Sequence, residues 1–412
     1  MGLARAASAA PGWGSGRLAG PCQAATMEQA MGEEATDDWR AQGQALLKQK
    51  RYDEALALCE KALAREPGNT SLWNQKGLVL AFELKRYEEA LAAFEQAITL
   101  APERPAAWNN KGDTLTSLGR FEEALAALEQ ALALDPHRAS AWNNKGRALE
   151  HLKRYEEALA ALDQALALDP NYATAWMNKS AALFDLKRYE EALASAERAL
   201  TLDANSSYAW NNKGNALRIL KGNREALAVY EQSILLDPNN AVAWSNKGGV
   251  LLRLGHVKKA LASCEQALKI DPNYALGWIN KGIALQTLGR RQEALESLDR
   301  AVTLDAANSR AWNNRGNVLF DLRRYEEALA AYDRAIALDP NYSLAYSNKS
   351  FALVRLKRNE QAVDAAEQAI RCDLQNPDFY LNKAKVYWKL RQFRQAVEVA
   401  GFADNLRRRK RS

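Results

Sequence analysis

The sequence contains few of the residues that build metal sites, disulfide frameworks or membrane spans. Its 412 residues include only 3 His, 4 Cys and 4 Met. The cysteines stand singly, with no Cys-x-x-Cys pair, which excludes a disulfide framework and a zinc finger and fits a reducing compartment. They are Cys22, Cys59, Cys264 and Cys372. No apolar run reaches the ~18 residues of a transmembrane helix. We therefore expect no metal, no cofactor, no membrane insertion and a cytoplasmic location.

Catalytic signatures are missing as well. The histidines fall at turns or helix ends, where we expect them to be solvated: His137, His151 and His256. No glycine-rich phosphate-binding loop occurs, and the glycines follow a repeat instead. These absences predict that the chain is not an enzyme.

Positive charge is concentrated near one end of the chain. The formal net charge is +6. Five positive charges form the run Arg407–Arg411, so the rest of the chain is nearly neutral. Such a body is not built to neutralise phosphates, and we do not expect it to bind nucleic acid. We interpret the run as a solubilising tail; a nuclear-type signal and a contact with RNA or an acidic surface are the alternatives.

Tryptophan, in contrast, is abundant and evenly spaced. It recurs at Trp39, Trp73, Trp108, Trp142, Trp176, Trp210, Trp244, Trp278 and Trp312, and Tyr346 and Tyr380 continue the series. All steps are 34 residues except the 35-residue step from Trp73 to Trp108. We assign the extra residue to a turn near 82–87.

Other positions keep the same phase. A small residue lies four positions after each aromatic, Leu recurs seven and ten positions after it, and Ala lies at sixteen, as in Gly146, Leu149, Leu152 and Ala158. The spacing of the apolar residues predicts two helices per unit. The second helix opens with acidic residues, which the positive end of a helix dipole favours.

This pattern resembles the tetratricopeptide repeat. The resemblance implies an all-α, right-handed superhelical solenoid of about eleven helix-turn-helix repeats. It also implies that proteins or peptides bind on an inner face made mostly by the first helices. We expect a leader over residues 1–35, the solenoid over 36–406 and a basic tail over 407–412. Residues 1–27 hold Arg5 and Arg17 but no acid; they are either an organellar targeting segment or a disordered leader before a start at Met27 or Met31.

An asparagine follows the repeat aromatic by two positions in nine consecutive units. The row comprises Asn110, Asn144, Asn178, Asn212, Asn246, Asn280, Asn314, Asn348 and Asn382. At 100° per residue this position lies about 200° from the tryptophan, away from the core of its own repeat. The row resembles the asparagine ladder that holds substrate polypeptides in the repeat region of O-linked N-acetylglucosamine transferase. We therefore predict that it binds the backbone of an extended peptide. The alternatives are a trace of repeat duplication or a bond to the neighbouring helix.

Positions five and nine after the aromatic vary, as specificity would require. They predict a mixed groove that becomes more apolar toward its C-terminal half. Phe320 and Phe351 belong either to that groove or to contacts between neighbouring units.

A basic residue follows each repeat aromatic by three positions, from Lys76 to Lys383. On the helical wheel it lies inside the apolar arc, where an unpaired charge is costly. We expect it to pair with an acid near the middle of the preceding second helix, as in Glu129 with Lys145. The Asp that precedes Pro, such as Asp135, is the alternative partner. Binding of external carboxylates or phosphates is the competing interpretation.

Taken with the resemblance, these features favour a non-enzymatic scaffold that binds proteins or extended peptide segments. One alternative is an accessory subunit that recruits substrates to a separate enzyme such as a glycosyltransferase. A second is an RNA-binding repeat protein.

Overall fold

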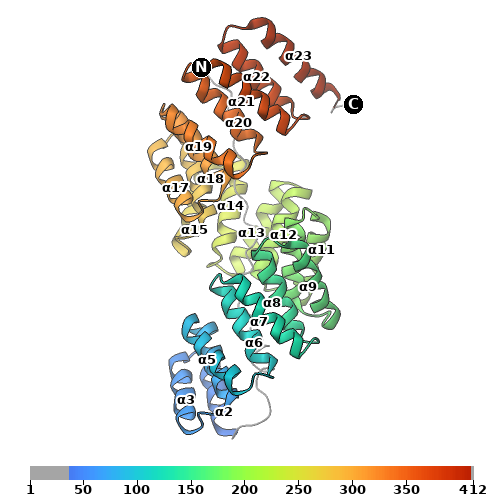
Figure 1. Ribbon diagram of the computed structural model, residues 1–412, viewed down its shortest axis with the longest axis vertical. Helices are drawn as coiled ribbons and strands as arrows, with labels where there is room; N and C mark the ends of the chain where they lie inside the picture. The colour runs from blue at the N-terminus through green and yellow to red at the C-terminus, as the bar shows by residue number, and fades with distance from the viewer. Residues whose placement is uncertain (1–36, 410–412) are drawn as a thin grey trace. The chain divides into compact units, whose positions relative to one another are not determined.

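The computed structural model describes residues 37–409, and within this range all regular structure is helical, with 22 α-helices and one π-helical turn. Figure 1 shows helices running antiparallel to their neighbours along the chain. The chain divides into two compact units at the boundary between Pro238 and Asn239. Each unit is described by itself below, as the N-terminal unit (37–238) and the C-terminal unit (239–409).

The N-terminal unit contains six helix pairs, which we number repeats 1 to 6. They are α2 (Asp37–Lys48) and α3 (Tyr52–Arg65); α4 (Thr70–Leu78) with the π-turn η1 (Val79–Glu83) and α5 (Tyr87–Leu100); α6 (Pro105–Ser117) and α7 (Phe121–Leu134); α8 (Ala139–His151) and α9 (Tyr155–Leu168); α10 (Ala173–Asp185) and α11 (Tyr189–Leu202); α12 (Ser207–Leu220) and α13 (Asn223–Leu236).

The C-terminal unit contains repeats 7 to 11. They are α14 (Ala241–Arg253) and α15 (Val257–Ile270); α16 (Ala275–Thr287) and α17 (Arg291–Leu304); α18 (Ser309–Asp321) and α19 (Tyr325–Leu338); α20 (Ser343–Arg355) and α21 (Asn359–Cys372); α22 (Pro377–Lys389) and α23 (Phe393–Arg409). The eleven pairs confirm the predicted all-α repeat solenoid.

The helices of each unit form two layers. The two helices of a repeat pack against each other, and the second helix also contacts the first helix of the next repeat. First helices additionally contact first helices, as α6 contacts α8 and α8 contacts α10. A layer of first helices therefore runs from α6 to α12 in the N-terminal unit and from α14 to α22 in the C-terminal unit.

Close approach of the two helices in a repeat depends on two matched positions. The small residue four positions after the aromatic faces the residue at position twenty. A Cβ added to Gly146 would lie 2.6 Å from Cγ of Leu162, and one added to Gly316 would lie 2.5 Å from Tyr332. Where the first position is Ser180 or Ser350, the facing residue is an alanine, Ala196 or Ala366. The volume added on one helix is thus removed from the other.

The extra residue of repeat 2 does not lie in a turn, and the sequence-based assignment was wrong there. The last part of its first helix is instead the π-helical turn Val79–Glu83, closed by a bond from the Leu84 amide to the Val79 carbonyl at 3.1 Å. A π-turn absorbs one residue inside a helix. The second helix can therefore begin in register with those of the other repeats.

None of the helices within 37–409 has the length and apolar character needed to cross a bilayer. The same residues contain no group of three or more His, Cys, Asp or Glu side chains arranged to hold a metal ion.

Candidate functional site

The asparagine row lies inside the layer of first helices. Eight of its nine members are 9% exposed or less: Asn110, Asn144, Asn178, Asn212, Asn246, Asn280, Asn314 and Asn382. Asn348 is partly exposed. The position does point away from the core of its own repeat, but the first helix of the preceding repeat covers that face.

Seven of these amides bond to the preceding repeat, at the residue that follows its aromatic. In five cases the side-chain Nδ2 donates to a side-chain oxygen: Asn110 to Asn74 (3.0 Å), Asn144 to Asn109 (3.1 Å), Asn178 to Asn143 (2.8 Å), Asn348 to Asn313 (3.0 Å) and Asn382 to Ser347 (3.0 Å). In two cases it donates to a backbone carbonyl: Asn212 to Met177 (3.1 Å) and Asn280 to Ser245 (3.2 Å). Bonding to the neighbouring helix, one of the sequence-based alternatives, is thus observed for these seven. Peptide binding by the row stays a prediction.

In repeats 2 to 5 the bonds join into one series, which we call the amide chain. Asn143 and Asn109 each also donate to the next asparagine of their own helix, at 3.4 and 3.2 Å. The series runs in the order Asn178, Asn143, Asn144, Asn109, Asn110, Asn74. Each internal amide uses both its donor and its acceptor, which satisfies buried polar groups that would otherwise destabilise the helix layer.

The amide chain ends where the asparagine after the tryptophan is replaced. Met177 stands there in repeat 5, and Asn212 bonds to its carbonyl instead. Ile279 stands there in repeat 8, and Nδ2 of Asn314 is buried without a hydrogen-bond partner among the described residues.

In four repeats the side chain at position five after the aromatic bonds to other residues of the protein. We therefore no longer count these four among the residues predicted to determine specificity. The buried Asp113 and Arg147 form an ion pair between repeats 3 and 4, and Arg147 Nη2 also donates to the Asp113 carbonyl at 3.2 Å. Removing one partner of a buried ion pair strongly destabilises the fold, because the other charge stays buried without compensation. The amides of Asn215 and Asn317 accept bonds from the core tyrosines Tyr230 and Tyr332, at 2.7 and 2.9 Å.

Position nine, in contrast, is exposed in most repeats. Its exposed members are Ser117, Ile219, Arg253, Thr287, Asp321, Arg355 and Lys389. These side chains vary in charge and size from one first helix to the next. We call them the variable face.

Aromatic residues at the start of second helices border the variable face. His151 stacks on Phe121 with ring centroids 4.7 Å apart, so it is not simply solvated as expected. The Arg355 guanidinium lies 5.2 Å from the ring centroid of Tyr325 and bonds to its hydroxyl at 2.9 Å. Burial, then the nearby carboxylates of Asp185 and Glu150, raise the pKa of Tyr155 to about 12.

The two phenylalanines left open by the sequence are both partly buried against cores. Phe320 packs against the cluster of repeats 8 and 9 and meets Tyr325 edge to face at 5.3 Å. Phe351 packs against the cluster that contains Leu353. Contact between neighbouring elements therefore accounts for both side chains.

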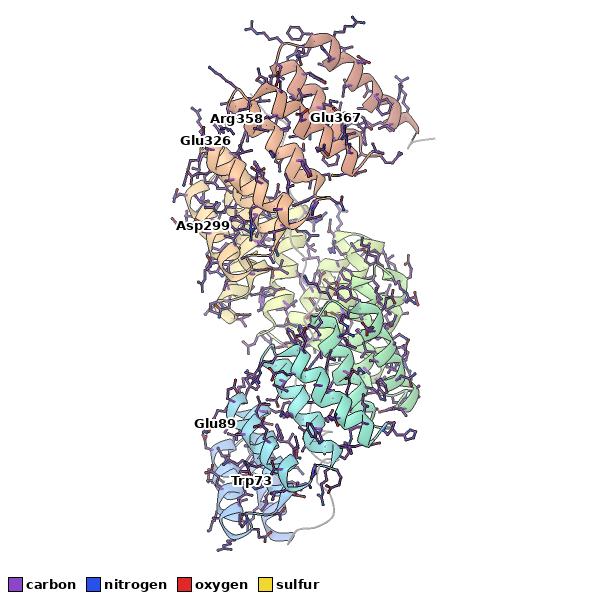
Figure 2. The ribbon with its side chains drawn as sticks, viewed as in Figure 1. Trp73, Glu89, Asp299, Glu326, Arg358 and Glu367 are labelled. Atoms are coloured by element: carbon purple, nitrogen blue, oxygen red, sulfur yellow. The ribbon has the colours of Figure 1, made fainter. Side chains whose placement is uncertain are left out.

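The basic row is structural, as predicted from its place in the apolar arc. Nine of its ten members lie within 4 Å of the acid sixteen positions earlier: Lys76–Glu60 (2.9 Å), Lys111–Glu95 (3.0 Å), Lys145–Glu129 (3.0 Å), Lys179–Asp163 (2.7 Å), Lys213–Glu197 (3.0 Å), Lys281–Glu265 (3.7 Å), Arg315–Asp299 (2.6 Å), Lys349–Asp333 (2.7 Å) and Lys383–Glu367 (3.4 Å). Figure 2 labels two of these acids, Asp299 and Glu367. Most of the cations also lie over the tryptophan of their own repeat, as Lys145 lies 5.6 Å from the Trp142 ring.

A second series of ion pairs, at the start of the second helices, was not predicted from the sequence. The residue before the second helix is an arginine in eight repeats. In seven of them, both carboxylate oxygens of the glutamate three residues later contact its guanidinium, in the Arg120–Glu123 pair at 2.7 and 2.6 Å. The pairs are Arg51–Glu54, Arg86–Glu89, Arg120–Glu123, Arg154–Glu157, Arg188–Glu191, Arg290–Glu293 and Arg324–Glu327. The i, i+3 spacing was visible in the sequence, but the acids were attributed to the helix dipole alone. We call these pairs the N-terminal clamps.

The ends of the chain lie largely outside these features. Helix α23 extends to Arg409, so the basic run begins inside a helix, and Arg407 pairs with Asp378 at 2.8 Å. The predicted leader over residues 1–35 and the last part of the tail, 410–412, lie outside the described residues.

Comparison with known proteins agrees with this repeat architecture. Models described as tetratricopeptide repeat match residues 36–69, 68–137, 110–173, 154–209, 207–240, 241–274, 275–308 and 309–342. No curated protein matches the sequence. Among solved structures, "Crystal structure of APC/C hetero-tetramer Cut9-Hcn1" is similar with a TM-score of 0.44 and 16% identity, over 90% of this chain and 95% of that chain. The matched repeat models run without a gap from 36 to 342, and the chain belongs to the tetratricopeptide repeat family.

Proposed function

We propose that this protein is a non-enzymatic interaction scaffold that binds an extended polypeptide segment of a protein partner along the first helices. The observation that carries the proposal is that the first helices combine repeated buried residues with varied exposed ones. Buried positions two and four after the aromatic repeat with little change, whereas position nine is exposed in most repeats and differs from one repeat to the next. A constant frame with a varied exposed row suits recognition of side chains along an extended chain.

In this proposal most of the nine asparagines stabilise the stacking of the first helices rather than bind the peptide. Amides that already bond to the preceding repeat would have to give up those bonds to hold a peptide. Asn348 is the most accessible member of the row, so we place direct contact with a peptide backbone there first. It lies in the same unit as the variable-face residues Asp321 and Arg355.

A peptide selection tests the proposal. A random peptide library displayed on phage is selected on the immobilised full chain, and selected peptides are titrated by fluorescence anisotropy. We expect the double variant Asp321→Ala and Arg355→Ala to bind at least fivefold more weakly than wild type. Both side chains are exposed, so the helices should be retained, which circular dichroism checks.

The matched control lies on the second helices of the same repeats. Glu326→Ala with Glu360→Ala removes two exposed charges from α19 and α21 and should leave peptide affinity unchanged. Equal losses in both double variants, or a library that yields no specific peptide, would overturn the proposal. A fluorescent single-stranded RNA that binds more tightly than every selected peptide would favour the RNA-binding alternative.

A further inference from the structure

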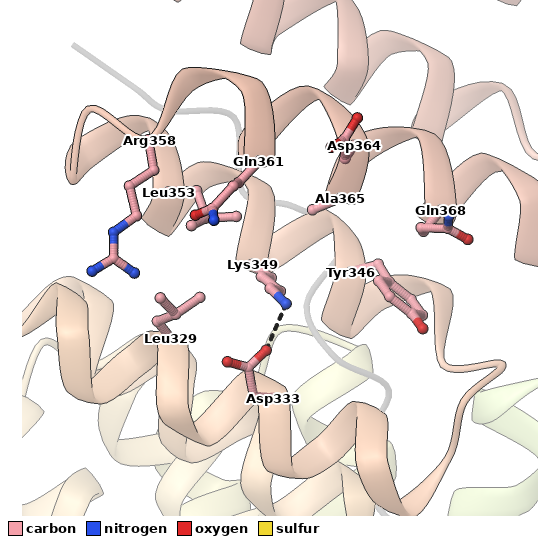
Figure 3. A pocket seen from close by; sticks show the side chains of 10 residues that line it. All are labelled: Leu329, Asp333, Tyr346, Lys349, Leu353, Arg358, Gln361, Asp364, Ala365 and Gln368. Atoms are coloured by element: carbon pink, nitrogen blue, oxygen red, sulfur yellow. Dashed lines mark ion pairs between the residues drawn. The ribbon is translucent and has the colours of Figure 1, made fainter.

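A pocket of about 380 Å³ lies between α19 of repeat 9 and α20 and α21 of repeat 10 (Figure 3). Its apolar lining comes from Leu329, Leu353 and Ala365, which are nearly buried. Charged and polar side chains form the rest: Asp333, Tyr346, Lys349, Arg358, Gln361, Asp364 and Gln368. The lining includes neither Asp321 nor Arg355, so the pocket is distinct from the variable face.

The N-terminal clamp of repeat 10 is incomplete. Arg358 stands where seven other repeats have the clamp arginine, but Gln361 replaces the glutamate. Within residues 37–409 the Arg358 guanidinium makes no hydrogen bond or ion pair. The cross-repeat pair seen at Arg120 and Glu88 (3.7 Å) also has no counterpart between Arg358 and Glu326.

The repeat aromatic that lines the pocket also differs from its counterpart in repeat 9. In repeat 9 the indole of Trp312 donates to the Ala306 carbonyl at 2.9 Å, and Arg315 lies over its ring at 5.7 Å. In repeat 10 the smaller ring of Tyr346 lines the pocket, and its hydroxyl makes no hydrogen bond in the described part of the chain. The smaller aromatic lies at the end of the pocket opposite Arg358, on the side of Gln368 (Figure 3).

The charges around the pocket favour an anion at the Arg358 end. Asp333 is neutralised by Lys349 at 2.7 Å, the ion pair that Figure 3 marks. Asp364 lies toward the other end of the pocket, beside Gln368. The guanidinium extends toward Leu329, so a ligand there would meet a positive charge next to an apolar wall.

We propose that this pocket binds a glutamate side chain of a protein partner, whose carboxylate occupies the place that the chain's own glutamate takes in seven other repeats. A guanidinium binds a carboxylate through two parallel hydrogen bonds, as each intact clamp does here. The methylene groups of the glutamate would pack against Leu329 and Leu353. This site is separate from the proposed peptide-binding face, and neither depends on the other.

The test observes Arg358 directly in the full chain. Protein labelled with ¹⁵N-arginine is titrated with N-acetylglutamate amide and, separately, with N-acetylglutamine amide. The Nε–Hε resonance of Arg358 is assigned from its absence in Arg358→Lys. We expect a saturable shift with the glutamate probe and at least a fivefold smaller one with the glutamine probe.

A substitution taken from the other repeats supplies the decisive variant. Gln361→Glu restores the clamp, which seven repeats accommodate, so the fold should be kept while the internal carboxylate competes. We expect the apparent affinity for the glutamate probe to fall at least fivefold. Unchanged affinity in this variant, or no saturable shift in wild type, would refute the proposal.

The control variant is Glu327→Gln, which frees Arg324 in repeat 9. The pocket of Figure 3 is lined by Arg358 and not by Arg324, so we expect no comparable shift at Arg324. An equal shift at Arg324 would mean that any freed arginine attracts the probe, and the pocket would then have no specific part in binding.

Discussion

Asn144 donates its side-chain amide to the side-chain oxygen of Asn109 in the preceding repeat, at 3.1 Å. Both side chains are buried, and both are internal members of the amide chain. Successive first helices are thus joined by directional bonds as well as by apolar packing. The asparagine row, predicted to bind an external peptide, thus has hydrogen-bond partners within the protein. Substitutions in the row should therefore change stability.

Removing an internal member of the amide chain should loosen two repeats. Asn144→Ala leaves the Asn109 oxygen and the Asn143 amide buried without this partner, a loss of about 1–3 kcal/mol. Hydrogen exchange measured by mass spectrometry should show faster local opening of α6 and α8. Local exchange is the suitable measurement because repeat arrays need not unfold in one step. Asn348→Ala, at a partly exposed position, should have the smaller effect, and equal effects would contradict this account.

The small residue at position four should not tolerate a side chain unless the facing residue shrinks. Gly146→Ala would place a Cβ only 2.6 Å from Cγ of Leu162. Overpacking of this kind lowers the free energy of unfolding by about 1–3 kcal/mol. The double variant Gly146→Ser with Leu162→Ala copies the natural pair Ser180–Ala196, in which the serine hydroxyl bonds to the Ala192 carbonyl at 2.7 Å. It should exchange more slowly in α8 and α9 than Gly146→Ser alone. No recovery in the double variant would refute the matched-volume explanation.

The thiols should react in an order set by burial. Burial raises the pKa of Cys264 to about 12 and that of Cys59 to about 11, so almost no thiolate forms near neutral pH. Cys372 is partly exposed. In a Cys22→Ser variant, a disulfide reagent at pH 8 should therefore modify one thiol in the folded protein and two more only after unfolding. Modification of Cys264 at the rate of Cys372 would contradict the burial described here.

The N-terminal clamps should make stability depend on acidity. Hydrogen bonding from Arg120, and then its charge, lower the pKa of Glu123 below its ordinary value of 4.5. A carboxylate with a lowered pKa stabilises the fold above that ordinary value, and the contribution is lost as pH falls through the folded-state pKa. Glu123→Gln should therefore lower the melting temperature at pH 7, and the difference from wild type should shrink toward pH 3. The effect will be small because the pair is exposed.

The reverse substitution provides the control for the clamps. Gln361→Glu should raise the melting temperature at pH 7, and the gain should disappear toward pH 3. A difference from wild type that stays constant between pH 7 and pH 3 in either variant would show that the carboxylate charge is not responsible.

Much of the fold followed from periodicity alone. Tryptophan at 34-residue steps, with small residues and leucines in fixed phase, predicted helix pairs from Trp39 to Tyr380. The pairing of Lys145 with Glu129 also followed, because a charge inside an apolar arc needs a partner. Such features are visible in the sequence because each depends on spacing within a helix or between adjacent helices.

The three-dimensional packing decided what the sequence left open. Helical geometry placed the asparagines opposite the tryptophans, but only the stacking of first helices determined that this face would be covered. The extra residue near Phe82 was detected by counting, yet whether it entered a turn or the π-helix Val79–Glu83 depended on the register needed for packing. Likewise, the replacement of Glu by Gln361 is visible in the sequence, but the pocket beside Arg358 exists only because α19, α20 and α21 meet there. Spacing along the chain thus determines which residues share a face, and packing determines which faces remain open to a partner.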